Sequence, residues 1–518
     1  MKSIYKYTLY ILFVAFFATS CTKEPEVGIL PVISGIESEY IVSLKQTLEL
    51  KPIIENAGEV TYKWMLDGVE ESTAPIYHYK APSVKGNHNL VLQVSSSSGI
   101  AQKVISIEVD EFTPINASTN TVLTLETPKM FADKKNIKWE VTKASDDLYR
   151  LVHPEEGTPL FIASNPGKYY VKATADGLEF TYLVLVRLEE NKRTPYIANV
   201  FDYLPAPGQF VNELPKYTEG DTHEDMVAKT GASLIGKNAT MITLGGFGGY
   251  VVFGFDHTVV NVEGKCDFRI NGNAFGALAN PRPDAPFGGS CEPGIVMVAY
   301  DKNKNGKPDE DEWYEIKGSG NVTAEDEAWY QMAVDNKNDV RTFRDYEMTY
   351  YRPKTEEPDE PGTIDHPNHF TTIYKYIRWT DNKGQEGYKI KNVYHKQTYY
   401  PAWIKEDKIT YKGIRLADNG IDESGQGSYY VLYAYRYGYV DNYPNNHDNS
   451  AIDIDWAIDK DGKPANLPGI DFVKVYNGVD KENGWLGEAS TEVAGAHDLH
   501  MLGANIDTKK VVDHYPVK

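Results

Sequence analysis

The chain has 518 residues, of which 41% are hydrophobic and 25% are charged, a balance typical of folded globular proteins. Its length suggests about three or four domains. The net charge of −21 argues against a nucleic-acid-binding protein, because no basic stripe is present to neutralise phosphates. It also argues against docking on an anionic membrane through surface charge.

The first 21 residues have the pattern of a secretion signal. Lys2 and Lys6 give a positive start, Tyr7–Ala18 is an apolar run that is short for a membrane span, and small residues then end on Cys21. This pattern resembles a bacterial lipoprotein signal, in which Cys21 becomes the lipidated first residue; an ordinary secretory signal is the alternative. The charged residues that follow resemble the tether of surface lipoproteins in the Bacteroidetes. The resemblance implies a lipid anchor in the outer membrane, exposure at the cell surface, and a tether over residues 22–30.

Residues 31–110 contain short runs of alternating apolar and polar residues, separated by Gly, Asn and Ser, which predicts strands. Val60–Trp64 is followed by the turn residues Asp67 and Gly68. This run resembles the central strand of a PKD or immunoglobulin-like sandwich, in which a tryptophan packs between two sheets. We therefore expect Trp64 to be a core residue and not a ligand contact.

Residues 111–193 repeat this plan less clearly. Trp139 stands where the first module has its tryptophan, and Lys168–Thr174 and Leu178–Arg187 have the composition of closing strands. Neither module shows a clustered acid pair, a nucleophile motif or metal-ligand spacing. We expect two immunoglobulin-like modules that form a stalk, with a domain boundary just before Thr194.

Residues 194–518 are predicted to form one large β domain, or two closely fused ones. Two apolar runs, Tyr250–Phe255 and Ile295–Tyr300, have strand length and composition. No sustained helical period is evident, and the one short helix we predict is Thr323–Val334. Many short strands over this length favour a jelly-roll-like domain with long loops. The predicted fold class is therefore all-β, with two immunoglobulin-like or PKD-like sandwiches before the large domain.

An acidic loop directly follows the second apolar run. Counted from its first aspartate, it places oxygen-bearing groups at positions 1, 3, 5, 7, 9 and 12 and glycine at position 6, as an EF-hand loop does. The predicted ligands are Asp301, Asn303, Asn305, the carbonyl of Lys307, Asp309 and Glu312. The sequence therefore predicts a calcium site.

The loop departs from an EF-hand in two respects. Asparagine replaces aspartate at Asn303 and Asn305, which lowers the charge and predicts weaker binding. No helix is readable on either side, so we expect a strand, a calcium loop and a second strand, with the ion holding a surface loop in place. The alternative is a polar Asn-Gly turn that binds nothing.

Besides Cys21, the chain has two cysteines, Cys266 and Cys291, which lie between the two apolar runs. In an oxidising compartment they could form a disulfide across neighbouring strands. Two buried, reduced thiols are the alternative.

Aromatic residues are unusually frequent, with 37 tyrosines. In Tyr429–Val440 alternate residues are tyrosines, so their rings share one face of the predicted strand. We expect most of these rings to pack between sheets, and the phenols near Asp441 to be better candidates for ligand contact. The candidate ligand-binding residues of the domain are Phe247, His257, Phe275, Trp313, Trp403, Tyr439, Tyr443 and Trp485.

Motifs of catalysis are sparse. The sequence has no GxSxG elbow, no HExxH and no phosphate-cradling loop, so we predict a binding protein and not an enzyme. A glycosidase carboxylate pair stays open, because its two members need not be close in the sequence.

Several runs together resemble one family. They are Gly249–Asp256, Gly272–Phe275, Cys291–Val296, Glu312–Tyr314, Tyr350–Pro353, Ile377–Asn382, Pro468–Val473 and Gly484–Glu488. Over about residues 240–500 the chain resembles the C-terminal domain of the BtuH family, Bacteroidetes surface lipoproteins linked to vitamin B12 uptake.

The resemblance implies that the protein binds cobalamin at the cell surface and hands it to an outer-membrane TonB-dependent transporter. His257 is then either a cobalt ligand or a structural histidine with satisfied hydrogen bonds. From a different class, the aromatic residues also suit a surface glycan-binding protein or, less well, a glycosidase.

Overall fold

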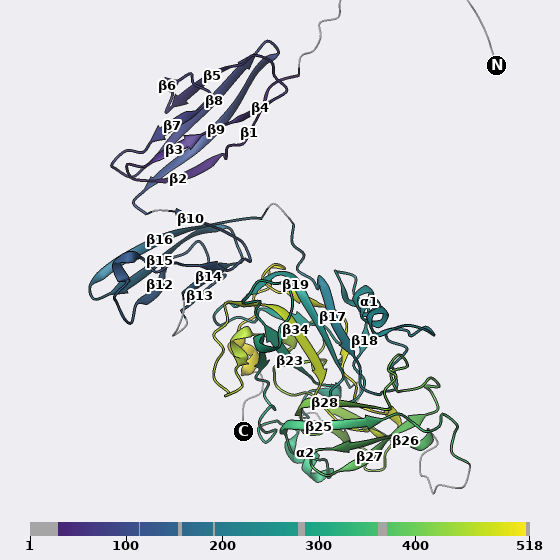
Figure 1. The fold of residues 1–518 in the computed structure, drawn as a ribbon. Coiled ribbons are helices and arrows are strands. Elements are labelled where there is room, and N and C mark those ends of the chain that lie inside the picture. Colours follow the sequence, from purple (N-terminus) through teal and green to yellow (C-terminus); the bar gives the residue numbers. More distant parts are fainter. Residues whose placement is uncertain are drawn as a thin grey trace, which may run out of the picture. The chain divides into compact units, whose positions relative to one another are not determined.

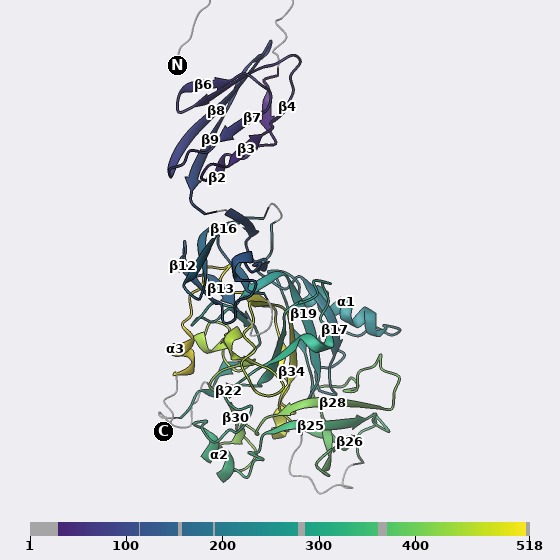
Figure 2. The same ribbon diagram turned by 60° about the vertical axis from the view of Figure 1, so that its left-hand side comes forward.

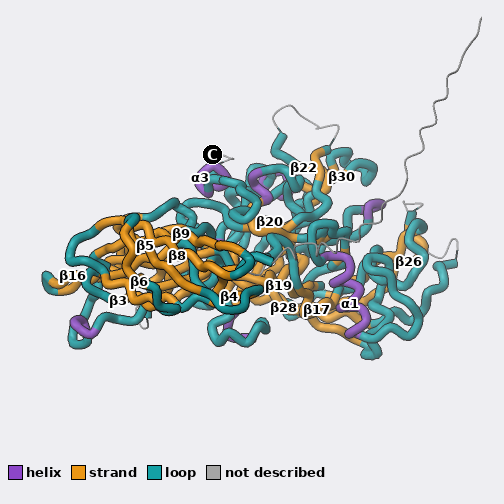
Figure 3. Tube along the Cα trace, turned by 90° about the horizontal axis from the view of Figure 1, so that it is seen from above, coloured by secondary structure: helices purple, strands orange, loops and turns teal. Residues whose placement is uncertain are grey.

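The computed structural model describes residues 29–112, 114–153, 158–189, 192–277, 285–360 and 370–513. The predicted signal, Cys21 and most of the predicted tether lie outside these residues. The chain divides into two compact units, Met1–Pro114 and Ile115–Lys518. Strands predominate in both (orange in Figure 3), which confirms the all-β fold class. No helix among the described residues is long and apolar enough to cross a membrane.

The first unit is a β-sandwich built around one five-stranded sheet. In spatial order its strands are β2 (Glu39–Ser43), β9 (Gly99–Asp110), β8 (Gly86–Ser96), β5 (Thr61–Leu66) and β6 (Val69–Ser72). Two pairs complete it: β1 (Val32–Ser34) with β4 (Ile53–Glu55), and β3 (Thr47–Leu50) with β7 (Tyr77–Lys80). Trp64 is fully buried, its ring stacks on Tyr77 at 5.2 Å, and its Nε1 donates to the carbonyl of Ala74 at 2.9 Å. The prediction that Trp64 is a core residue is confirmed.

The second unit begins with a smaller sandwich. One sheet has β10 (Pro114–Ser118), β16 (Leu178–Arg187), β15 (Gly167–Ala175) and β12 (Lys138–Lys143), and the other has β11 (Leu123–Thr124), β14 (Leu160–Ala163) and β13 (Tyr149–Val152). Arg150 forms a two-pronged ion pair with Asp455, at 2.6 and 3.1 Å, and Ile162 joins the core of the larger part. The small sandwich and the remainder of the chain therefore belong to one compact unit.

The larger part is organised around a seven-stranded antiparallel sheet (Figures 1 and 2). Its order is β17 (Asn199–Leu204), β19 (Tyr250–Val260), β34 (Gly469–Asn477), β23 (Gly294–Ala299), β24 (Trp313–Ile316) and β33 (Ala457–Ile458), with β31 (Tyr439–Val440) beside β23. Side chains alternate between the two faces of a strand. Val251, Val296, Val473 and Val475 share the face that packs into the main hydrophobic core, and all four are fully buried.

Four further sheets complete this part. A four-stranded sheet has β27 (Glu386–Asn392), β26 (Thr371–Asp381), β25 (Phe343–Tyr351) and β28 (Lys408–Arg415); another has β21 (Phe275–Gly276), β22 (Gly288–Ser290), β30 (Tyr430–Tyr433) and β29 (Gly420–Asp422). The smallest are β32 (Ala451–Ile452), β20 (Phe268–Ile270) and β36 (Ala496–Asp498), and the pair β18 (Ile242–Thr243) with β35 (Glu492–Val493).

Helices are short, and the longest was not predicted. The α-helices are α1 (His223–Leu234), α2 (Tyr330–Asp335) and α3 (Thr508–Val512), and the 3₁₀ turns are η1 (Lys129–Phe131), η2 (Glu310–Glu312), η3 (Asp448–Ser450), η4 (Ile454–Trp456) and η5 (Gly484–Leu486). A capping box between Thr222 and Asp225 starts α1, and Met226 and Leu234 bury its inner face. α2 covers only the last part of the predicted Thr323–Val334, from Tyr330, and extends one residue beyond it.

Candidate functional site

The predicted calcium loop connects β23 to β24, so a strand stands on each side of it, as expected. The loop turns sharply at Gly306, whose φ is +72°, a conformation that glycine adopts without strain. Both carboxylate oxygens of Asp301 accept backbone N–H groups, from Asn305 at 3.0 Å and from Gly306 at 2.8 Å. A single 3₁₀ turn, η2, stands where an EF-hand would start its second helix.

The side chains of the loop converge on one another. The amide nitrogens of Asn303 and Asn305 both donate to the same oxygen of Asp309, at 2.6 and 2.8 Å. The carboxylate of Glu312 is buried and accepts the N–H of Lys302 at 2.8 Å, which points it back to the start of the loop. All the side-chain groups that converge carry oxygen, the donor atom that calcium prefers. The residues present therefore fit a hard cation.

Five of the predicted ligand-binding residues are buried, and this corrects the prediction for them. Phe247, His257, Trp403, Tyr439 and Tyr443 are between 0 and 8% exposed. The rings fill cores: Phe247 meets Tyr346 edge-on at 5.1 Å, for example. Phe247, Trp403, Tyr439 and Tyr443 are therefore core residues in this structure.

His257 is a structural histidine, the second of the two alternatives that the sequence left open. Its Nδ1 lies 2.9 Å from Asp256 and its Nε2 lies 3.0 Å from Asp498. Burial disfavours its charged form, but the hydrogen bonds and charges of the two aspartates outweigh this and raise the pKa of His257. With both ring nitrogens engaged, His257 has no nitrogen free to ligate a metal.

The two cysteines do not form the disulfide given as one alternative. Cys266 and Cys291 are both free and fully buried. They pack in different hydrophobic clusters, Cys266 beside Leu499 and Cys291 beside Tyr443. The second alternative, two buried thiols, describes the structure.

The remaining predicted ligand residues, Phe275, Trp313 and Trp485, stay accessible. Trp313 is half-buried on β24, and Phe275, on β21, is 58% exposed. Trp485, in η5, is 37% exposed and its indole N–H donates to the carbonyl of Ser428 at 3.3 Å. Of these three residues, Trp485 is the best candidate for ligand contact, because other exposed aromatic rings lie beside it.

Phe370, Tyr394 and Trp485 form an aromatic patch on the surface. The ring centres of Phe370 and Tyr394 are 5.9 Å apart and those of Phe370 and Trp485 are 6.3 Å apart. Phe370 is 36% exposed and Tyr394 is 60% exposed. Phe370 precedes β26 and Tyr394 follows β27, two strands paired at this end, so the sheet brings their rings together. Exposed aromatic groups of this kind mark interaction sites.

Gln209 fixes the base of the aromatic patch. Its side-chain oxygen accepts from Asn392 at 2.8 Å, and its side-chain nitrogen donates to the carbonyl of Leu486 at 3.0 Å. Asn392 in turn accepts the backbone N–H of Tyr394 at 2.9 Å. The segments that carry Tyr394 and Trp485 are thus tied to one side chain, which limits the ordering cost of binding a ligand there. Gln209, Phe370 and Tyr394 were all missed from the sequence.

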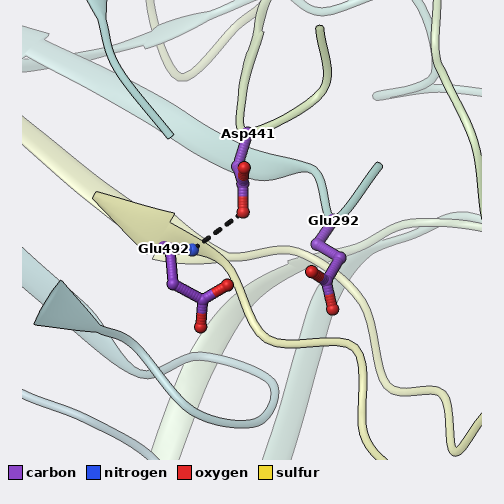
Figure 4. A group of neighbouring side chains, drawn as sticks. All are labelled: Glu292, Asp441 and Glu492. Atoms are coloured by element: carbon purple, nitrogen blue, oxygen red, sulfur yellow. Dashed lines mark hydrogen bonds between the residues drawn. The ribbon is translucent and has the colours of Figure 1, made fainter. Parts of the chain in front are cut away.

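A second group of interest is the acidic group Glu292, Asp441 and Glu492 (Figure 4), whose carboxylate oxygens lie within 4.8 Å of one another. Asp441 and Glu492 are buried, and Glu292 is partly exposed. Asp441 accepts three backbone N–H groups, including that of Glu492 at 2.9 Å. The three carboxyl groups lie close together, and none of them forms a hydrogen bond with a basic side chain among the described residues. The pKa of each is raised.

Burial is the main reason why these pKa values are raised. Burial and the neighbouring charge of Asp441 raise the pKa of Glu292 to about 8. Burial raises the pKa of Asp441 to about 7, although its backbone hydrogen bonds lower it, and the pKa of Glu492 lies well above its usual value. Carboxylates this close repel one another when all are ionised, which favours the protonated form of at least one of them.

Comparisons with known proteins add little. No family model matches the chain, and no curated protein matches it. Among solved structures, a three-domain immunoglobulin fragment of titin has 17% identity over 31% of this chain and 65% of its own length, with a TM-score of 0.14. A quinoprotein alcohol dehydrogenase-like protein of Bacteroides thetaiotaomicron has 16% identity over 30% of this chain and 38% of its own, with a TM-score of 0.15. The chain thus spans under two thirds of both, and TM-scores this low carry no argument. The fold and patch define an all-β protein with immunoglobulin-like sandwiches and an aromatic surface group.

Proposed function

We propose that this protein is a cell-surface lipoprotein that binds a small ligand, cobalamin or a related corrinoid, and delivers it to an outer-membrane TonB-dependent transporter. The lipid anchor is Cys21, the sandwiches act as a stalk, and the ligand-binding part is the C-terminal region. The observation that carries the proposal is the aromatic patch of Phe370, Tyr394 and Trp485.

The chemistry of the patch supports a ligand with a flat, partly apolar face. Aromatic side chains provide a large contact area at a low cost in conformational entropy. A corrin ring is a broad macrocycle with an apolar edge and polar amide substituents. Three rings with backbone and amide groups beside them suit that combination. Calcium, bound by the Asp301–Glu312 loop, would hold the connection between β23 and β24 in place.

Titration calorimetry of the whole chain with cyanocobalamin tests the proposal. We expect measurable heat and co-elution on gel filtration at micromolar protein concentration. Neither heat nor co-elution at that concentration would reject corrinoid binding.

A surface glycan is the second candidate, because exposed aromatic rings also pack against the faces of sugars. A glycan array separates the two: binding to a defined glycan, with no response to cyanocobalamin, would favour this candidate. A reducing-sugar release assay on the bound glycan then tells a glycan-binding protein from a glycosidase.

A further inference from the structure

A cleft of about 740 Å³ lies away from the aromatic patch, between the seven-stranded sheet and the sheet of β25 to β28. β25 and β28 lie next to the end of β34 in both views (Figures 1 and 2). This volume is within the range of small-molecule sites. The cleft therefore has room for a ligand of its own.

The floor of the cleft is the face of the seven-stranded sheet that turns away from the main core. Lys474 on β34, Met297 on β23 and Glu315 on β24 lie opposite one another in register, so their side chains form one row across this face. Tyr250, on β19, lines the same floor. Arg344 and Thr410, from β25 and β28, line the opposite wall.

The charges that line the cleft are balanced with one exception. Its three carboxylates each pair with a cation: Glu315 with Arg344 at 2.6 Å, Asp345 with Lys383 at 3.5 Å, and Glu347 with Lys412 at 2.8 Å. Lys474 forms no ion pair with any residue in the described part of the chain. One lining cation is therefore left without an anion.

The surroundings of Lys474 shield its ammonium in part from solvent. Its side chain is partly buried, and its Nζ lies 4.3 Å from the centre of the Tyr250 ring. The charge of Asp202 acts on Lys474, but the two oxygens of Asp202 are engaged by the hydroxyl of Tyr250 at 2.7 Å and by His223 at 2.9 Å. Burial lowers the pKa of Lys474, while the charge of Asp202 raises it. An ammonium in this setting gains more from an added anion than a fully hydrated one does.

We propose that the cleft binds a small organic anion, with its carboxylate or phosphate group on Lys474 and its planar part on Tyr250 and Met297. The charge-assisted hydrogen bonds from the ammonium to an oxyanion are among the stronger ones in proteins. The ring and the thioether supply the apolar contact. This site is separate from the aromatic patch, so it stands independently of corrinoid binding.

Titration calorimetry of the whole chain with phenyl phosphate, benzoate and benzamide tests the charge requirement. We expect one or both anions to bind, and the neutral benzamide to bind at least about tenfold more weakly. The stronger anion identifies the preferred oxyanion. Equal binding of benzamide, or no binding of either anion at millimolar concentration, would overturn the proposal.

Variants then locate the site. K474M should weaken binding of the preferred anion at least about tenfold, whereas K474R should keep most of it because the charge remains. K460M, which removes an exposed lysine outside the cleft, is the control and should bind as the unchanged chain does. Unchanged binding by a folded K474M chain contradicts the assignment.

A measurement on the unchanged chain covers the case in which K474M does not fold. Mass spectrometry follows acetylation of each lysine by a water-soluble active ester. The preferred anion should slow modification of Lys474 several-fold and leave Lys460, which is exposed and outside the cleft, unaffected. Equal rates at Lys474 with and without the anion would also overturn the proposal.

Discussion

The carboxylate of Asp471 accepts the backbone N–H of Asp301 at 2.8 Å. Asp471 lies on β34, and its other oxygen accepts the hydroxyl of Thr258 on β19 at 2.7 Å. The first residue of the acidic loop is thus fixed to two central strands of the seven-stranded sheet. A loop anchored in this way loses less conformational entropy when it binds an ion.

Calcium is therefore expected to stabilise the second unit. At one hundred times its Kd, an ion that binds only the folded state adds about 2.7 kcal/mol to the free energy of unfolding. Differential scanning calorimetry should show a lower Tm after EDTA treatment and recovery when calcium is added. Asp301→Ala should abolish this shift, because it removes the ligand at position 1 and the acceptor for two backbone N–H groups.

Asp461→Ala is the matched control for Asp301→Ala. Asp461 is an exposed acid in a turn outside the predicted site, so this variant should keep the full calcium shift. A melting curve of the unchanged chain that does not move with EDTA would reject the calcium site.

The acidic group predicts a pH dependence of stability. Glu292 and Asp441 have folded-state pKa values of about 8 and about 7, whereas unfolded carboxyls titrate near 4. The folded state therefore binds more protons, and stability falls as the pH rises from about 4 to about 8, by at most about 1.4 kcal/mol per pH unit for each group. Urea unfolding of the second unit should give a lower free energy of unfolding at pH 8 than at pH 5.

Glu292→Gln should flatten this dependence, because the amide keeps the shape of the side chain and cannot ionise. Glu325→Gln, at an exposed acid outside the acidic group, is the control and should leave the slope unchanged. If the free energy of unfolding falls equally steeply between pH 5 and pH 8 for Glu292→Gln and for the unchanged chain, Glu292 is not the group that binds the proton.

Local patterns predicted most of the strands, Trp64 and the strand–loop–strand order at the acidic loop, because each depends on residues close together in the sequence. The prediction of one strand over Tyr429–Val440, with its tyrosines on one face, was wrong: the structure has two short strands there, β30 and β31, joined by a loop. α1 had a readable local signal as well: Thr222 and Asp225 have capping-box spacing, and Met226, Thr230 and Leu234 recur at helical intervals.

Whether an aromatic residue is buried or exposed could not be predicted from such local patterns. Tyr439 and Trp485 each follow a glycine in the sequence, yet Tyr439 is enclosed, with its hydroxyl donating to Asn321 at 2.6 Å, whereas Trp485 is exposed. Burial of a ring depends on which sheets close over it, and that is a property of the tertiary structure. The pairing of β26 with β27 likewise joins Phe370 to Tyr394, 24 residues apart in the chain.

Ligand binding at the aromatic patch predicts a selective loss. Trp485→Ala and Tyr394→Ala should each weaken binding of cyanocobalamin by about tenfold, since a well-placed aromatic contact contributes on the order of 1–3 kcal/mol. Calorimetric titration measures the change. Tyr388→Ala removes a ring of similar exposure, 41%, outside the patch, and should leave the Kd unchanged. Equal Kd values for all three variants and the unchanged chain would place the ligand elsewhere.

The division into two compact units predicts two separable unfolding events. Trp64→Ala should destabilise the first unit by about 3–5 kcal/mol, because it leaves a cavity in the core and orphans the carbonyl of Ala74. The transition of the second unit should stay where it is, since Trp64 belongs to the hydrophobic core of the first unit. Ile100→Ala, at an exposed position of the same unit, should change neither transition. Calorimetry of the whole chain resolves the two events, and a shift of both transitions by Trp64→Ala would mean that the units unfold together.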